Sequence, residues 1–305
     1  MRKTTTWPCR GGSKFALDLF CGAGGVGLAL RRSGYRAVGI DNDPDAVEIY
    51  RSACGEAICA DIRILNPADF DRPDLLWASP PCQPWSEARR QLGLPWGFDH
   101  RDGDLLMTAV EWITALQPLC GVIENVGGIP DVSLSTPIER LEQAGYTVTV
   151  FYLNARFWVP QNRDHVFIIA APHPVPAPSA PPRRHLFADI MDGHNAEPVQ
   201  IQHLRYAIAK RAFPTPVIGP NDVLPTVSTR PYSARWTCFV MEKPGHLRFP
   251  TFNEAARAQG FPDDHPLHDL AREHASVAWR LLGNAVPVPL AAAVIKSIDE
   301  TIWQP

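Results

Sequence analysis

The feature that most constrains the fold is a repeated alternation of short apolar runs with segments of helical periodicity. The apolar runs have the length of buried strands rather than helices. Strands are expected at residues 15–20, 36–41, 57–61, 75–78, 121–126, 147–153 and 166–171. Helices are expected between them at residues 28–33, 45–53, 104–116 and 136–144. This alternation predicts an α/β fold, with a doubly wound, mostly parallel, Rossmann-like sheet and helices on both faces.

A proline-rich segment divides the chain. Residues 172–182 read Pro-His-Pro-Val-Pro-Ala-Pro-Ser-Ala-Pro-Pro, a composition typical of a stiff, extended linker. Residues 183–247 have weak periodicity and many prolines, which indicates a small, loop-rich domain. Helical spacing returns at residues 253–259, 276–282 and 290–298. The sequence therefore predicts a catalytic and cofactor-binding domain of residues 1–171 plus 272–305, and a small domain of residues 172–271.

Composition indicates a reducing, cytoplasmic compartment. The seven cysteines are odd in number and lack Cys-x-x-Cys spacing, which argues against a disulfide framework and against a zinc site. No apolar run approaches the roughly 20 residues that span a bilayer. Residues 1–14 lack the apolar core of a secretory signal. We therefore expect a cytoplasmic protein with no membrane partner and no bound metal, and a monomer is the default.

Charge is distributed unevenly along the chain. Residues 172–247 carry eight Lys and Arg against five Asp and Glu, whereas the segments before and after have net charges of −4 and −2. A polyanion would therefore dock more readily on this middle block. The excess is small, and a merely solvated surface would produce it as well.

A glycine-rich turn follows the first expected strand. Residues 22–27 have Gly-x-Gly-x-x-Gly spacing, and Asp41 ends the next strand. This arrangement is typical of dinucleotide binding, with the acid placed for a ribose hydroxyl. Any nucleoside-bearing cofactor can use the same turn. Because Asp18 and Asp61 add two more acids nearby, the turn suits S-adenosylmethionine better than a pyrophosphate, since that cofactor carries a sulfonium and an ammonium but no phosphate.

The segment that follows the strand at 75–78 carries a single cysteine between prolines. Neither Pro80 nor Pro81 can donate to a sheet ladder, so the strand ends there. Cys82 then stands on a turn at the carboxyl end of a strand, where the sites of α/β proteins collect. This position suits a nucleophilic thiol. A buried structural cysteine is the alternative, because unpaired cysteines are among the most buried residues.

Four more polar residues lie near the ends of expected strands or helices. Glu124 is placed to be a general acid, although a solvated carboxylate would look the same. Arg163 offers a fixed fork of donors for a carboxylate, carbonyl or phosphate, or is a surface arginine. His165 is a further candidate for the catalytic group, although it would also fit as a core histidine. Asn284 lies in a break between two helices, where its amide and backbone could close over a cofactor.

The chain resembles the cytosine-5 DNA methyltransferases along nearly its whole length. The matching motifs, in the family's order, are Phe20-Cys-Gly-Ala-Gly-Gly25, Asp41, Asp61-Ile62, Pro80-Pro-Cys-Gln-Pro-Trp-Ser86, Glu124-Asn-Val126, Gln161-Asn-Arg163, Arg248 with Glu254-Ala-Ala-Arg-Ala-Gln-Gly-Phe-Pro262, and Gly283-Asn-Ala-Val286. The combination of Pro-Cys-Gln and Glu-Asn-Val with this glycine loop is very specific. The alternative of a nicotinamide dehydrogenase, which the glycine turn alone would suggest, does not explain these motifs. The resemblance implies a DNA (cytosine-5-)-methyltransferase with S-adenosyl-L-methionine as cofactor and DNA as partner.

The resemblance also implies a mechanism. The Cys82 thiolate would add to carbon 6 of a cytosine flipped out of the duplex, which makes carbon 5 reactive towards the methyl donor. Glu124 would hydrogen-bond the ring nitrogen and the exocyclic amine, and Arg163 would hold the pyrimidine carbonyl or orient Glu124. The alternatives are the same chemistry on RNA cytosine, or transfer of a larger group from a modified adenosyl cofactor. A cognate restriction endonuclease is a further expected partner.

The family's binding residues carry over onto matching positions of this chain. The implied cofactor-binding residues are Phe20, Gly22, Gly24, Gly25, Asp41, Asn42, Asp61, Ile62, Pro80, Asn284 and Val286. Residues 85–101 resemble the family's mobile loop, and the DNA contacts expected in or beside it are Gln83, Ser86, Arg89 and Arg90. The block before Arg248 corresponds to the target-recognition region. Its candidates for phosphate or base contacts are Arg183, Arg184, Arg205, Lys210, Arg211, Arg230, Tyr232 and Arg235.

One position departs from the family pattern. Many members carry a second arginine two residues after the first, in Gln-x-Arg-x-Arg, and here that position is His165. A histidine is shorter and only partly charged near neutral pH. We predict that His165→Arg keeps or raises methylation activity, measured as transfer of a labelled methyl group to DNA. A complete loss of activity would show that the histidine has a role of its own.

Overall fold

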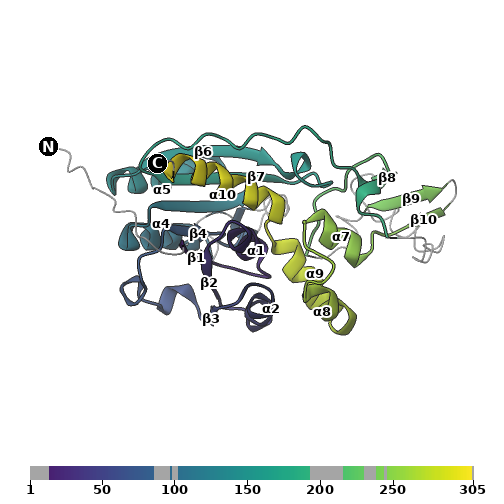
Figure 1. Ribbon diagram of the computed structural model, residues 1–305, viewed down its shortest axis with the longest axis horizontal. Coiled ribbons are helices and arrows are strands. Elements are labelled where there is room, and N and C mark those ends of the chain that lie inside the picture. Colours follow the sequence, from purple (N-terminus) through teal and green to yellow (C-terminus); the bar gives the residue numbers. More distant parts are fainter. Residues whose placement is uncertain are drawn as a thin grey trace.

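The computed structural model describes residues 14–85, 97, 102–192, 216–229, 238–243 and 246–303. A seven-stranded sheet in the order β3-β2-β1-β4-β5-β7-β6 forms its centre (Figure 1). The strands are β1 (Phe15–Leu19), β2 (Arg36–Asp41), β3 (Ala57–Cys59), β4 (Leu75–Ala78), β5 (Cys120–Val126), β6 (Thr147–Asn154) and β7 (Asp164–Ala171). Strands β1 to β5 pair in parallel, and β7 runs antiparallel between β5 and β6. The predicted mostly parallel α/β sheet is therefore confirmed.

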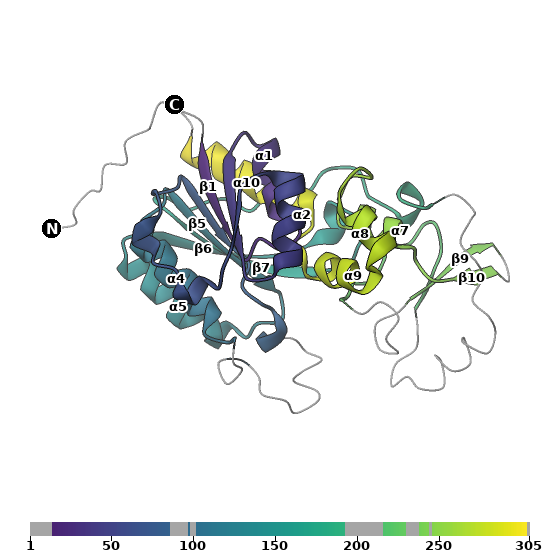
Figure 2. The same ribbon diagram turned by 90° about the horizontal axis from the view of Figure 1, so that it is seen from below.

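Helices cover both faces of this sheet. The helices are α1 (Gly25–Arg32), α2 (Pro44–Cys54), α4 (Leu105–Leu116), α5 (Asp131–Gln143), α7 (Phe252–Ala258), α8 (Leu267–Glu273), α9 (Ala275–Asn284) and α10 (Val288–Ile302). Helices α4 and α5 lie on one face, and α1 and α10 lie on the other (Figure 2). This is the doubly wound arrangement that the alternating sequence pattern predicts.

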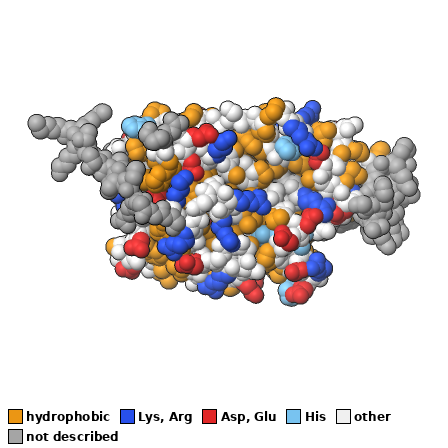
Figure 3. Space-filling model, viewed as in Figure 1, with side chains coloured by type: hydrophobic (Ala, Val, Ile, Leu, Met, Phe, Trp, Pro, Cys, Tyr) orange, Lys and Arg blue, Asp and Glu red, His pale blue; other side chains and the backbone are white. Residues whose placement is uncertain are grey.

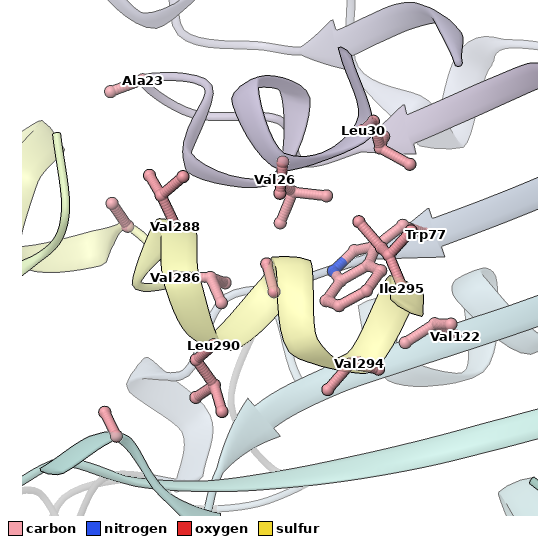
Figure 4. Close-up of a cluster of buried hydrophobic side chains, with 14 of the residues drawn as sticks. Ala23, Val26, Leu30, Trp77, Val122, Val286, Val288, Leu290, Val294 and Ile295 are labelled. Carbon is pink, nitrogen blue, oxygen red and sulfur yellow. The ribbon is translucent and has the colours of Figure 1, made fainter. Parts of the chain in front are cut away.

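Alternate residues of the strands build two separate cores. Trp77 of β4 points to the face of α1 and α10, where it lies among Leu30 and Ile295 (Figure 4). Its neighbour Leu76 belongs to the opposite cluster with α4 and α5. Successive strand residues point to opposite faces, so a fully apolar strand such as β4 can fill both cores at once. The carboxyl ends of the strands are thereby held between two packed layers.

Two helices begin earlier than expected. Helix α1 begins at Gly25 rather than residue 28, because its glycines continue the helix instead of ending in a turn. Helix α5 begins at Asp131 rather than residue 136, and Pro137 lies inside it. Val132 in its first turn is 80% exposed and its neighbours Asp131 and Ser133 are polar, so apolar spacing does not mark this start. Helix α8 was not predicted at all.

The proline-rich segment is not a free linker where the structure describes it. Val175 is buried in the core cluster of α10, and Ser297 of that helix donates its hydroxyl to the Pro176 carbonyl at 2.5 Å. Residues 255, 256 and 267, from the predicted small domain, join the same cluster. The domain division at residues 172 and 271 therefore stays a prediction.

The second half of the chain contains a small sheet, although weak periodicity there suggested only loops. It has the order β10-β9-β8, with β8 (Val217–Ile218), β9 (Phe239–Lys243) and β10 (His246–Arg248). Arg248 ends it and pairs with Glu254 through two bonds of 2.6 and 2.7 Å, with both side chains at most 1% exposed. A buried pair of this kind must be complete, because one partner alone would leave an uncompensated charge. The Arg248 and Glu254 motif thus joins the small sheet to α7.

One helical stretch, residues 275–302, is long and apolar enough to cross a membrane by length and composition alone. The sequence does not read as one uninterrupted apolar run, because residues 283–289 contain glycine, asparagine and two prolines. In the fold, 72% of its most apolar stretch of 18 residues is buried. A core helix of a folded domain passes the same test, and the packing of α10 on β4 accounts for this composition.

The start of α1 gives a test of close packing. A Cβ atom at Gly25 would lie 2.4 Å from the carbonyl oxygen of Val286, in the turn between α9 and α10. Because that oxygen belongs to the backbone, we expect Gly25→Ala to lower the free energy of unfolding by about 2 kcal/mol. Urea denaturation of the ligand-free protein measures this. Gly128→Ala is the matched control, since its added Cβ meets no atom within 4 Å and its φ is not positive. Equal stability of the two variants would contradict the prediction.

Candidate active site

A cavity of about 1090 Å³ opens at the carboxyl ends of the parallel strands. Ligands of open α/β sheets bind in this position, outside the strand ends. Helix α9 closes the cavity from the other side. Residues from the strand ends and following loops that line it are Phe20, Gly22, Asp41, Asn42, Asp61, Ile62, Pro80, Cys82, Gln83, Glu124 and Arg163; Asn284 lines it from α9. The cavity thus brings together most of the residues singled out by the sequence.

The glycine turn is fixed to the end of β2 by a hydrogen bond. The Gly22 N–H donates to Oδ2 of Asp41 at 2.9 Å, and the Asp43 N–H donates to Oδ1 of the same carboxylate at 2.9 Å. Burial raises the pKa of Asp41, while these backbone donors oppose the rise. The turn therefore directs an acid into the cavity, and its first glycine amide is already engaged.

Three residues predicted to bind the cofactor do not line the cavity wall. They are Gly24, Gly25 and Val286. A Cβ at Gly24 would lie 2.7 Å from the Cys54 sulfur, and Gly24 has φ 86°. The contacts seen here give the two glycines a packing role behind the wall. Their binding role stays a prediction.

Asp61 ends the cavity on the β3 side. Its carboxylate accepts from the Arg63 guanidinium at 2.6 to 3.2 Å, and this pairing lowers the pKa of Asp61. Arg63 itself lines the cavity and was missed by the sequence reasoning. The signal available was only its spacing, two residues after the acid. Ile62 between them is buried and supplies an apolar wall.

The cysteine turn is held against β5. The Asn125 side-chain amide donates to the Pro80 carbonyl at 2.9 Å, while the Trp85 N–H donates to the Cys82 carbonyl at 3.0 Å. Residues Gln83–Trp85 form a single 3₁₀ turn. Asn125 was not proposed from the sequence, although it follows the acid in the Glu-Asn-Val motif. Its buried amide fixes where the thiol lies relative to β5.

The Cys82 thiol is partly exposed on the cavity wall and lies between opposing charges. Desolvation raises its pKa above the ordinary value; Arg163 opposes this rise and Glu124 adds to it. The thiol is therefore predominantly protonated in the free protein at neutral pH. The thiolate form of Cys82 becomes more populated if the positive charge of Arg163 acts on it more strongly or if the negative charge of Glu124 is removed.

Arg163 joins three separate parts of the chain. Its Nη1 donates to the Val227 carbonyl at 3.0 Å and its Nη2 donates to the Gly283 carbonyl at 3.1 Å. Its Nε has no partner among the described residues, although it is buried. The Nε–H is therefore unused in a guanidinium whose charge acts on Cys82 and Glu124, and it suits a carbonyl of a bound base.

His165 and Glu124 form a direct contact between neighbouring strands. The His165 Nδ1 and the Glu124 Oε1 are 2.6 Å apart. Glu124 lines the cavity, whereas His165 lies behind it and is 1% exposed. Burial lowers the pKa of His165 despite the neighbouring acid. His165 is thus a buried histidine that touches a cavity residue, and its catalytic role stays a prediction.

An ion pair crosses the outer edge of the cavity. Arg280 of α9 pairs with Asp43 and, at 3.1 Å, with Asp45 at the start of α2. Arg280 and Asp43 both line the cavity. No local pattern predicts this pair, because its members are more than 230 residues apart along the chain. The contact ties the two elements that face each other across the opening.

The family of the chain follows from a match of its sequence. The model of the family described as C-5 cytosine-specific DNA methylase matches residues 15–210 and 201–300. The chain belongs to this family. It is therefore a DNA (cytosine-5-)-methyltransferase, and the resemblance inferred from its motifs is confirmed.

Individual relatives align with almost the whole length of the methyltransferase. Type II methyltransferase M.NgoBI of Neisseria gonorrhoeae is 30% identical over 92% of this chain and 91% of its own length. M.NlaX of Neisseria lactamica is 28% identical over 94% of this chain and 96% of its own length. Among solved structures, S. pombe Dnmt2 has a TM-score of 0.75 at 19% identity, covering 94% of this chain and 98% of its own. EhMeth of Entamoeba histolytica has a TM-score of 0.78 at 15% identity, covering 95% and 99%. These two likenesses concern the fold.

Few of the predicted DNA contacts of the methyltransferase lie in the described residues. Gln83 is exposed at the cavity mouth, Arg184 is exposed, and Arg183 pairs with Asp189 at 2.8 Å with its side chain 73% exposed. On the face seen in Figure 3, basic and acidic side chains are interspersed. The contacts that lie outside the described residues are Ser86, Arg89, Arg90, Arg205, Lys210, Arg211, Arg230, Tyr232 and Arg235.

The raised pKa of Cys82 gives a chemical test on the free methyltransferase. Because the thiolate is the reactive form and burial raises the pKa of Cys82, we expect iodoacetamide at pH 8 to modify Cys82 several times more slowly than an exposed thiol. Cys59 is free and exposed, so it serves as the reference within the same molecule. Peptide mapping by mass spectrometry measures both rates. Equal rates would contradict the prediction.

Proposed function

We propose that this methyltransferase transfers a methyl group from S-adenosyl-L-methionine to carbon 5 of a cytosine flipped out of a specific DNA sequence, through a covalent bond to Cys82. One observation carries the proposal. Cys82, Glu124 and Arg163 line the same cavity as Gly22 and Asp41 of the glycine turn. A nucleophile for the base and a binding turn for a nucleoside cofactor therefore open into one space.

The cavity fits the cofactor by its charge. In a dinucleotide site, the amides of the glycine turn are free for a pyrophosphate. Here the Gly22 amide donates to Asp41. Asp43 and Asp61 are paired with Arg280 and Arg63, but the described residues of the wall still include five Asp and Glu against three Arg. An acidic wall with an occupied amide suits a ligand that carries a sulfonium and an ammonium. When bound, S-adenosylmethionine supplies an electrophilic methyl group. The residues proposed to hold it are Phe20, Gly22, Gly24, Gly25, Asp41, Asn42, Asp61, Ile62, Pro80, Asn284 and Val286.

The side chains around Cys82 suit the covalent step. The Cys82 sulfur forms a bond to carbon 6, and the electron pair of the carbon 5–carbon 6 bond becomes available at carbon 5. Glu124 hydrogen-bonds N3 and the exocyclic amine, which stabilises the negative charge on the ring. The free Nε–H of Arg163 binds the pyrimidine carbonyl. After carbon 5 is methylated, water takes its proton, the double bond re-forms and the sulfur leaves.

Other parts of the chain would supply sequence recognition. The relatives M.NgoBI and M.NlaX are type II methyltransferases, which supports modification of a defined DNA site. We assign recognition to residues 172–271 and catalysis to residues 1–171 plus 272–305. A cognate restriction endonuclease, a monomeric state and a cytoplasmic location are proposed on the same basis. The DNA contacts would come from the candidates named from the sequence, and His165 would act with Cys82, Glu124 and Arg163 in catalysis.

Replacement of the nucleophile tests the mechanism. We expect Cys82→Ser to lower methyl transfer by at least about a thousandfold, because a serine hydroxyl is a far weaker nucleophile than a thiolate, while DNA binding is retained. Labelled S-adenosylmethionine, duplex DNA and bisulfite sequencing report the product and its position together. Cys59→Ser, at an exposed cysteine that does not line the cavity, is the control and should keep full activity.

Parallel substrates separate the alternatives. Transfer RNA in place of DNA should remain unmodified, and mass spectrometry of the nucleosides should give 5-methylcytosine rather than a larger adduct. Undiminished turnover by Cys82→Ser would remove the thiolate from the mechanism. Modification of RNA alone would overturn the choice of substrate.

A further inference from the structure

The contact between His165 and Glu124 gives the histidine a defined chemical role. His165 lies in β7 and Glu124 in β5, and these strands pair antiparallel with Val126 opposite His165. The register places the two side chains close enough for the 2.6 Å contact between Nδ1 and Oε1. Among the described residues, the Glu124 carboxylate has one hydrogen-bond partner, which is the imidazole of His165. The position of this carboxylate in the cavity therefore depends on the histidine.

The imidazole is neutral in this position. Its Nε2 is buried and has no partner among the described residues. Protonation would add an N–H at Nε2, and this buried donor would have no acceptor, which is costly. Burial accordingly lowers the pKa of His165. The neutral ring carries its proton on Nδ1, because that nitrogen faces a carboxylate, and donates it to Glu124 Oε1.

The other charged groups near the pair do not replace this bond. Arg163 lies close to the pair, but two of its donors bind the Val227 and Gly283 carbonyls. Cys82 faces Glu124 across the cavity wall, and Asp164 precedes His165 in β7. Asp164 accepts from Asn154 of β6, which directs it away from the pair. The remaining neighbours of His165 include the Phe167 ring at 6.0 Å, which cannot hold a carboxylate.

We infer that His165 is a positioning residue whose neutral Nδ1–H fixes Oε1 of Glu124, so that Oε2 faces N3 of the base and carries the proton given to it. This inference rests on the proposed function. The Cys82 thiol first gives its proton to water. When the resulting thiolate adds to carbon 6, the O–H bond at Oε2 breaks, an N3–H bond forms, and the resulting carboxylate keeps its bond from Nδ1–H. When the sulfur leaves, the proton returns to Oε2. A permanent cation in this position would stabilise the ionised carboxylate, whereas a neutral donor leaves the carboxyl able to hold this proton.

Three variants of His165 separate the effects of its N–H donor, its ring and its charge on the rate of methyl transfer. His165→Asn keeps an N–H near the position of Nδ1 without a titrating ring, His165→Leu removes the donor, and His165→Arg adds a fixed charge. In single-turnover methylation of duplex DNA, we expect Leu to lower the rate about thirtyfold, the loss for one hydrogen bond to a charged group. Asn should stay within about threefold of the natural protein. Dissociation constants for S-adenosylmethionine and for DNA should change less than about twofold in both variants, because Glu124 acts on the reacting base.

The pH profile tests the charge. We expect His165→Arg to keep methyl transfer but to move the alkaline limb of the rate profile to lower pH, because the cation favours ionised Glu124 and the proton needed at N3 is then lost at lower pH. The Asn variant should leave that limb in place.

Three results would overturn the inference: an unchanged rate for Leu, an equal loss for Asn and Leu, or an unchanged profile for Arg. Failure of the proposed function is distinct, since the natural protein itself would then methylate no cytosine in DNA.

Discussion

The site depends on one buried guanidinium. Arg163 binds the carbonyls of Val227 and Gly283, which lie 64 and 120 residues away along the chain. A buried cation can be held only where acceptors satisfy it, so the loop at 227, the end of α9 and the start of β7 must meet at this point. The same side chain faces Cys82 and opposes the effect of burial on the thiol pKa. Assembly of the cavity and adjustment of its nucleophile thus share one residue.

Close packing extends this dependence to the glycines. A Cβ atom at Gly283 would lie 2.4 Å from the Thr229 backbone nitrogen, so the chain segment beside Val227 can approach α9 only because residue 283 has no side chain. Gly25 plays a similar part on the other side of the α9–α10 turn, against Val286. Motifs that appear to serve ligand binding therefore also bring backbone segments into contact. The two roles are not separable by sequence pattern alone.

The sequence predicted what local patterns determine. Strands β2 and β4 have the bounds expected from their apolar runs, and Cys82 and Glu124 lie at the ends of neighbouring strands and line one cavity. Arg163 joins them because β7 runs antiparallel to β5, which the local pattern did not indicate. Contacts between distant segments left no local signal. The insertion of β7 between β5 and β6, the pairing of Arg280 with Asp43, and the buried Val175 in a segment that looked like a linker all arise from tertiary packing.

The hydrogen bond from Gly22 to Asp41 has a consequence for the design of inhibitors. A phosphate group placed against the turn would meet a carboxylate and find no free amide at Gly22, so nucleotide analogues are poor starting compounds. A nucleoside that bears an amine or another cation would instead gain from the acids on that wall. Selectivity over nucleotide-binding enzymes with a similar glycine loop would then come from the sign of the ligand's charge rather than from its shape.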